Sequence, residues 1–184
     1  MKKLLILLAT FSLISCSNDN PQETHEFRDS LIGYYKLQSV YSDEAIDLNG
    51  DGIAQNNLMI EAECQNSFFE YFYGEFTYNS SANKSEFSID VPYSYYSVFL
   101  ESQTTCIEKT GLFNNVTINE QTQEITIIEA DRYEEWEAEN GSITHIMWEN
   151  GLIHFIVIKE LYTTEGWQQV NIHLIYNKWI PNSD

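Results

Sequence analysis

The fold class follows from one stretch of sequence, HIMWENGLIHFIV at residues 145–157. Apolar side chains occupy alternate positions on both sides of Asn150-Gly151, and alternation with a period of two is typical of β-strands. Asn-Gly between two such runs is the strongest short-range signal for a β-hairpin. A two-residue turn here pairs Trp148 with Ile153.

A second turn at residues 163–166 extends the hairpin to a third strand and places Phe155 opposite Leu174. In that register one face is predicted to line a barrel interior, and its members are Ile146, Trp148, Ile153, Phe155, Val157, Val170, Ile172, Leu174 and Tyr176. The opposite face carries His145, Met147, His154, Ile156, His173 and Ile175. A slip of one residue would exchange the two faces on one strand.

The rest of the chain also reads mainly as strands. The first strand is predicted at residues 31–41, and further strand candidates are residues 68–73, 75–78, 86–91, 95–100, 116–118 and 124–128. The charged residues 129–139 are interpreted as a solvated strand that enters another hairpin at Asn140-Gly141. Residues 58–64 fit either a helical turn or the start of a strand. The prediction is an all-β protein, an antiparallel up-and-down barrel of about eight or nine strands over residues 30–184.

The N-terminus indicates export. Lys2 and Lys3 precede an apolar run, and a small residue stands directly before Cys16. This resembles a bacterial lipoprotein signal, with residues 1–15 removed and Cys16 lipidated. An ordinary secretory peptide or a membrane-spanning helix are the alternatives, and the apolar run is too short to span a bilayer comfortably. The polar residues 16–29 are interpreted as a flexible tether.

The charge balance excludes some partners. The chain carries 28 acidic and nine basic residues, and loss of the two signal lysines leaves about −21 on the mature chain. Such a field repels nucleic acid and anionic lipid surfaces. We therefore expect no nucleic-acid partner, and contact with the membrane through the lipid anchor only. An acidic surface that merely keeps an anchored protein soluble explains the same composition.

Cys64 and Cys106 remain as a pair once Cys16 is lipidated. Exported compartments are oxidising, so a disulfide is expected. It would close a loop of about 40 residues and stabilise the fold by about 3 to 4 kcal/mol through chain entropy.

A calcium loop is suggested by the stretch Asp47-Leu48-Asn49-Gly50-Asp51-Gly52. Asp47, Asn49 and Asp51 stand at positions 1, 3 and 5 of such a loop, and Ile53 supplies a carbonyl at position 7. Position 12 is a leucine, so Glu61 or Glu63 would have to supply the last carboxylate. A turn-rich surface loop without an ion explains the same residues.

Other clusters point more weakly to chemistry. His145, His154 and His173 share a face, yet only diagonal neighbours on adjacent strands converge on one metal. Two of the glutamates at residues 134–139 could act as a catalytic carboxylate pair like that of glycosidases. A run of charged residues is, however, more often a solvated face. The sequence holds no nucleophile motif and no phosphate loop. A non-enzymatic protein is therefore expected.

A family resemblance rests on three features. Gly33-Tyr34-Tyr35 is similar to the Gly-x-Trp signature of lipocalins, with tyrosine in place of tryptophan, and Lys178-Trp179 is similar to the basic residue that lipocalins pack across that ring. The residue 47–52 loop followed by Cys64 resembles lipocalin-like domain lipoproteins of Bacteroidota. The resemblance implies a small antiparallel barrel and little about function.

Two function classes remain open. The first is a lipid-anchored, lipocalin-like barrel of the bacterial cell envelope, at the outer membrane, that binds a small apolar or amphipathic molecule. The alternative is a structural or interaction lipoprotein whose barrel is filled. The chain's aromatic content of 12 Tyr, 10 Phe and 4 Trp fits a cavity lining and a packed core equally well.

Overall fold

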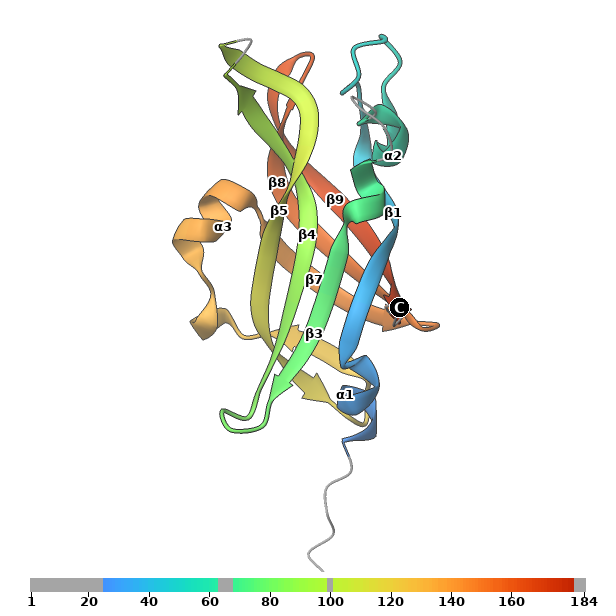
Figure 1. Ribbon diagram of the computed structural model, residues 1–184, viewed down its shortest axis with the longest axis vertical. Helices are drawn as coiled ribbons and strands as arrows, with labels where there is room; N and C mark the ends of the chain where they lie inside the picture. The colour runs from blue at the N-terminus through green and yellow to red at the C-terminus, as the bar shows by residue number, and fades with distance from the viewer. Residues whose placement is uncertain (1–24, 63–67, 99–100, 181–184) are drawn as a thin grey trace, which may run out of the picture.

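The computed structural model describes residues 25–62, 68–98 and 101–180, without the side chains of residues 68, 96 and 102–106 (Figure 1). The expected signal peptide, Cys16, Cys64 and the Cys106 side chain therefore lie outside the described residues. Among the helices that are described, none has the length and apolar character needed to cross a membrane.

The chain folds into strands joined mostly by short turns. The strands are β1 (Gly33–Ile46), β2 (Gln55–Asn57), β3 (Tyr73–Asn79), β4 (Lys84–Ser97), β5 (Ser102–Asn119), β6 (Glu124–Ile127), β7 (Ser142–Glu149), β8 (Leu152–Thr163) and β9 (Gly166–Trp179). The helical segments are α1 (Glu26–Leu31), α2 (Leu58–Glu61), η1 (Phe68–Tyr71), η2 (Glu129–Asp131) and α3 (Glu134–Asn140).

The sheet is an antiparallel barrel, as predicted. Its order is β6-β5-β4-β3-β1-β9-β8-β7, and β2 pairs with β1 off this path. β9 returns to lie beside β1, and β6 lies next to β7, which nearly closes the barrel. Closure removes most of the unpaired strand edges that would otherwise invite association.

The predicted register of the last three strands is confirmed. Trp148 pairs with Ile153, and Phe155 pairs with Leu174. The predicted interior residues are buried, with one exception, because Trp148 is only half-buried near the α1 end. The alternation of apolar and polar residues therefore predicts correctly which side chains point into the barrel.

Aromatic rings fill the middle of the barrel. Phe87 lies at the centre, with its ring centroid 4.6 Å from that of Phe76 and 5.4 Å from that of Phe155. Tyr35 and Tyr176 extend the same cluster, and all five side chains are at most 1% exposed. This part of the barrel is a packed core.

Residues 129–139 are not a strand, so that prediction is wrong. They form η2 and α3, and α3 ends where Gly141 adopts a φ of +98°. Asn140-Gly141 is therefore a helix end rather than a hairpin turn. α3 lies against β5, where Trp136 Nε1 donates to Gly111 O at 2.9 Å. This tertiary contact favours the helix over the strand.

Two further segments differ from the sequence prediction, and a third decides between the alternatives that the sequence left open. Residues 68–71, expected as strand, form η1, and residues 58–61 form the helical turn α2. Residues 26–29, assigned to the tether, lie in α1, whose Phe27 and Leu31 are buried. Packing therefore begins a few residues earlier than the apolar pattern indicates.

Candidate functional site

A hollow of about 1240 Å³ lies at the α1 end of the barrel, the lower end in Figure 1. Its walls come from residues 25–30 around α1 and residues 117–126 of the β5–β6 hairpin, and Trp148 of β7 lies at its edge. Segments far apart in the sequence therefore meet here.

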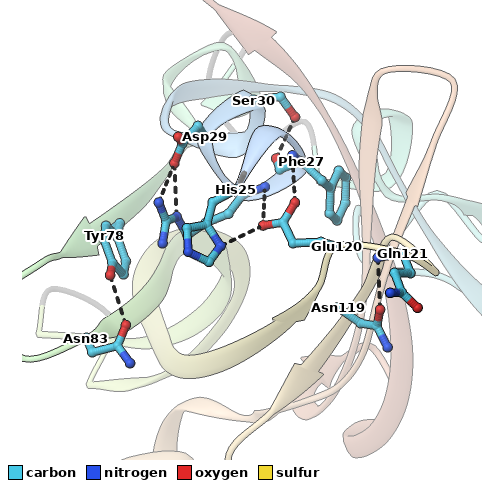
Figure 2. A network of polar contacts seen from close by, with 10 residues as sticks. His25, Phe27, Asp29, Ser30, Tyr78, Asn83, Asn119, Glu120 and Gln121 are labelled. Atoms are coloured by element: carbon cyan, nitrogen blue, oxygen red, sulfur yellow. Dashed lines mark hydrogen bonds and ion pairs between the residues drawn. The ribbon is translucent and has the colours of Figure 1, made fainter. Parts of the chain in front are cut away.

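Glu120 joins the two walls, as Figure 2 shows. Its carboxylate accepts hydrogen bonds from Phe27 N at 2.8 Å and Arg28 N at 3.3 Å, and one oxygen lies 3.6 Å from His25 Nδ1. The first amides of a helix lack partners within the helix, so a carboxylate from another element satisfies them. Glu120 in effect caps α1.

The β5–β6 turn holds Glu120 in place. Asn119 Oδ1 accepts a hydrogen bond from the amide of Gln121 at 3.0 Å (Figure 2) and another from the amide of Thr122 at 3.1 Å. Asparagine favours this side-chain turn in the residue that ends a strand. Gln123 completes the hairpin with a φ of +57°.

The hollow has an apolar side and a polar side. Phe27 and Trp148 meet edge to face with centroids 6.1 Å apart, and Ile118 packs against the core beside them. Glu26, Glu120 and Glu124 supply carboxylates on the other walls. This arrangement suits a molecule with one apolar face and one face rich in donors or positive charge.

The predicted calcium loop lies at the opposite end of the barrel, next to α2. Asp47 Oδ1 accepts from Gly50 N at 2.7 Å, and Asp47 Oδ2 accepts from Gly52 N at 3.0 Å. Gly50 and Gly52 have φ of +78° and +82°, a region that favours glycine.

The other two side chains of the loop make the same kind of turn. Asn49 Oδ1 accepts from Asp51 N at 2.9 Å, and Asp51 Oδ1 accepts from Ile53 N at 2.8 Å. The structure therefore brings the four predicted ligands into one compact loop. Within the described ranges, however, no three His, Cys, Asp or Glu side chains converge as a ready metal site.

Glu61, which the sequence offers as a substitute for position 12, lies against this loop. Its Oε2 accepts a 3.1 Å hydrogen bond from Leu48 N. Glu61 is fully buried at the end of α2. Glu63 lies outside the described residues.

Two of the three outer-face histidines come together. His154 Nε2 lies 2.9 Å from His173 Nδ1, and His173 Nε2 lies 2.7 Å from Asp43 Oδ1. His145 is exposed, and no hydrogen bond of its side chain is found among the described residues, although its backbone pairs with Ile156 of β8. Sequence reasoning missed Asp43, because 130 residues separate it from His173.

Sequence reasoning also missed Lys159, although the period-two pattern of β8 places this residue on the inward face. It occupies an interior position of β8 between Val157 and Leu161, and it is buried. Its Nζ lies 5.3 Å from the ring centroid of Tyr93. Burial lowers the pKa of Lys159 from 10.5 to about 7.

Glu134, Glu135 and Glu139 of α3 line a shallow, open hollow of about 580 Å³ on the outside of the barrel. Glu137 turns to the barrel, where its oxygens accept from Asn114 Nδ2 at 3.0 Å and Ser142 Oγ at 3.0 Å. Glu134, Glu135 and Glu139 are exposed. Glu137 thus holds the seam between β5 and β7.

The comparisons with known proteins give no relative: no family model, no curated protein and no solved structure matches this chain. The resemblance to lipocalins therefore stays a prediction from the residues named in the sequence. Of those, Tyr35 is buried in the ring cluster and donates through its hydroxyl to Leu31 O. Lys178 lies against Gly33 and donates to Ser30 O at 2.5 Å.

Proposed function

We propose that this protein is a lipid-anchored, lipocalin-like binding barrel without enzymatic activity, and that it takes a small amphipathic molecule in the hollow at its α1 end. The observation that carries the proposal is the two-sided lining of that hollow. Phe27, Trp148 and Ile118 supply apolar surface to it, and Glu120 and Glu124 supply carboxylates to the same lining.

The charges around the hollow favour a cationic or donor-rich head group. Arg28, the basic residue of α1, is held by Asp29, with Nη2 2.8 Å from Oδ1, and its guanidinium lies over the ring of Tyr78. The net charge of the chain is −19. An anionic head group would therefore meet repulsion, and a cationic one attraction.

The barrel interior is a weaker candidate for the same ligand. The ring cluster around Phe87 occupies the middle of the barrel at native packing distances. Octanoate and octylamine have the same alkyl chain and opposite charges. A comparison of their binding therefore distinguishes the hollow at the α1 end from the barrel interior. Octanoate would pair with Lys159 inside the barrel, and octylamine with Glu124 at the hollow.

The experiment is a titration of the mature chain at pH 7 with each molecule, followed by NMR. We expect octylamine to shift the indole N–H signal of Trp148 and octanoate to leave it unchanged. Glu124→Gln should weaken octylamine binding several-fold. Glu165→Gln, an exposed change at the β8–β9 turn, is the matched control. A response to octanoate with shifts around Lys159 would instead place the ligand inside the barrel.

The anchor has its own test. Cys16→Ala should release the protein from membranes into a soluble exported fraction, because the described helices offer no spanning segment. Fractionation of cells expressing each form measures this. Continued membrane association of Cys16→Ala would contradict lipidation at that residue.

A second candidate function is favoured by the packed core. If neither octylamine nor octanoate binds, the filled barrel would serve as a structural or interaction module of the envelope. Its surface would then act through protein contacts rather than through a small molecule.

A further inference from the structure

Glu61 is a buried acidic side chain whose carboxylate is only half satisfied by the described residues. The residue is 0% exposed. One carboxylate oxygen, Oε2, accepts from Leu48 N, and the other, Oε1, has no hydrogen-bond partner among the described residues. None of the ion pairs formed by described residues includes Glu61.

Such an arrangement is costly in a folded protein. A buried polar atom without a partner loses the hydrogen bonds that water gave it, and a buried charge costs more unless it is paired or coordinates a metal. A positive partner that is absent from the described side chains would remove the cost.

The position of Glu61 indicates where that partner would sit. Leu48 is the second residue of the predicted calcium loop, so the bond from Leu48 N places the Glu61 carboxylate at the base of this loop. Leu48 and Leu58 are fully buried and fix the loop and α2 in the core. The loop that carries Asp47 and Asp51 is therefore tied directly to a carboxylate whose Oε1 lacks a partner among the described residues.

We propose that the loop and Glu61 together bind one calcium ion, with Glu61 as the carboxylate that closes the site. The remaining ligands are the side chains of Asp47, Asn49 and Asp51 and the carbonyl of Ile53. Calcium accepts six to eight oxygens in flexible geometry, whereas magnesium requires a near-ideal octahedron. The site offers oxygen alone, which disfavours zinc and copper.

The hydrogen bonds within the loop are compatible with coordination. A carboxylate oxygen has more than one lone pair, so Asp47 and Asp51 keep their amide partners while they contact an ion. The three carboxylates do not converge in this structure, so binding draws the loop toward Glu61. Thr164 holds the loop from the other side, with Oγ1 3.2 Å from Asp47 O.

The test is thermal unfolding of the mature chain in calcium, in magnesium and in chelator. At a calcium concentration a hundred times the dissociation constant, the midpoint should rise by about 5 to 10 °C. Glu61→Gln keeps the shape and removes the charge, so in chelator it should be at least as stable as the natural protein and should lose the rise. Asp51→Ala should lose the rise as well.

The control is Glu149→Gln, an exposed change at the β7–β8 turn away from the loop, which should keep the full rise. Calorimetric titration with calcium should also give one site for the natural protein and none for Glu61→Gln. Equal midpoints in calcium and chelator would overturn the proposal. An undiminished rise in Glu61→Gln would show that the ion binds without this carboxylate. Neither result depends on the hollow at the α1 end.

Discussion

Lys159 Nζ donates a 3.0 Å hydrogen bond to the main-chain oxygen of Asn140 at the end of α3. The bond connects an interior position of β8 to the helix that covers the seam of the barrel. Thr110 Oγ1 reaches the side chain of the same asparagine at 2.8 Å. Asn140 thus ties β5, α3 and β8 together.

The buried amine makes stability depend on pH. Burial lowers the pKa of Lys159 to about 7 in the folded state, against 10.5 when unfolded. The unfolded chain therefore holds more protons between pH 7 and 10.5, and stability rises with pH through that window. The free energies of unfolding of the natural protein and of Lys159→Met, measured in urea, should therefore differ less at pH 9.5 than at pH 7.

Lys159→Met should itself stabilise the protein at pH 7, by about 2 to 4 kcal/mol, because it removes a buried amine that has lost most of its hydration. Loss of the bond to Asn140 offsets part of the gain. A variant less stable than the natural protein would show that the bond outweighs the burial cost. Lys36→Met, at a half-buried position of β1, is the control.

The histidine pair predicts a loss of stability in acid. Burial, and then the positive charges of His173 and His145, lower the pKa of His154. The unfolded state therefore binds more protons as pH falls through 6.5, and stability declines there. His154→Gln should reduce this decline, by less than about 1 kcal/mol because the site is partly solvated.

The measurement is the urea midpoint at pH 7.5 and pH 5. Asp43 only accepts hydrogen bonds, so it fixes the proton on His173 Nε2, and His173 Nδ1 accepts from His154. Tyr41 stacks on His173 with centroids 4.7 Å apart. His145→Gln removes only the smallest of the three causes, so its effect should be smaller, and an equal effect of the two changes would argue against the pair.

Removal of the Glu120 carboxylate should loosen α1. Glu120→Ala leaves the amides of Phe27 and Arg28 without their acceptor, which should cost about 0.5 to 2 kcal/mol, as for a lost helix cap. Hydrogen exchange at these two amides should accelerate, while Glu124→Ala should leave it unchanged. Unchanged exchange in Glu120→Ala would mean that α1 is held by Phe27 and Leu31 alone.

Gly141 has no room for a side chain. A Cβ there would lie 2.6 Å from Lys159 Cβ and 2.9 Å from Ile158 O. Gly141→Ala should therefore destabilise by about 3 kcal/mol or more, through clash as well as strain. Gly151 also has a positive φ but open space around it, so Gly151→Ala should cost only about 1 kcal/mol. If the two variants lost the same free energy of unfolding in urea, a clash at Gly141 would be excluded.

The cysteine pair gives a chemical prediction. Thiol labelling of the unfolded, unreduced mature chain should find Cys64 and Cys106 protected. Cys106→Ser should then lower the free energy of unfolding by about 3 kcal/mol. Labelling of both residues without reductant would show that the pair is reduced.

Local physics determined the β-rich part of this protein. The turn at Asn150-Gly151 and the period-two alternation around it were enough to place Trp148 opposite Ile153, and the turn at residues 163–166 placed Phe155 opposite Leu174. The spacing of Asp47, Asn49 and Asp51 likewise predicted a tight loop, because these side chains bond amides only two to five residues away.

Only the tertiary structure decided the helices and the long-range polar contacts. Residues 134–140 lack a helical apolar stripe, and α3 depends on contacts such as Trp136 with Gly111 across the seam. α1 depends on Glu120, 93 residues from Phe27. Lys159 and Asp43 meet their partners only because the closed barrel brings distant segments together. The periodicity of a sequence indicates which face of a strand a residue occupies, but it does not indicate which residue lies next to it.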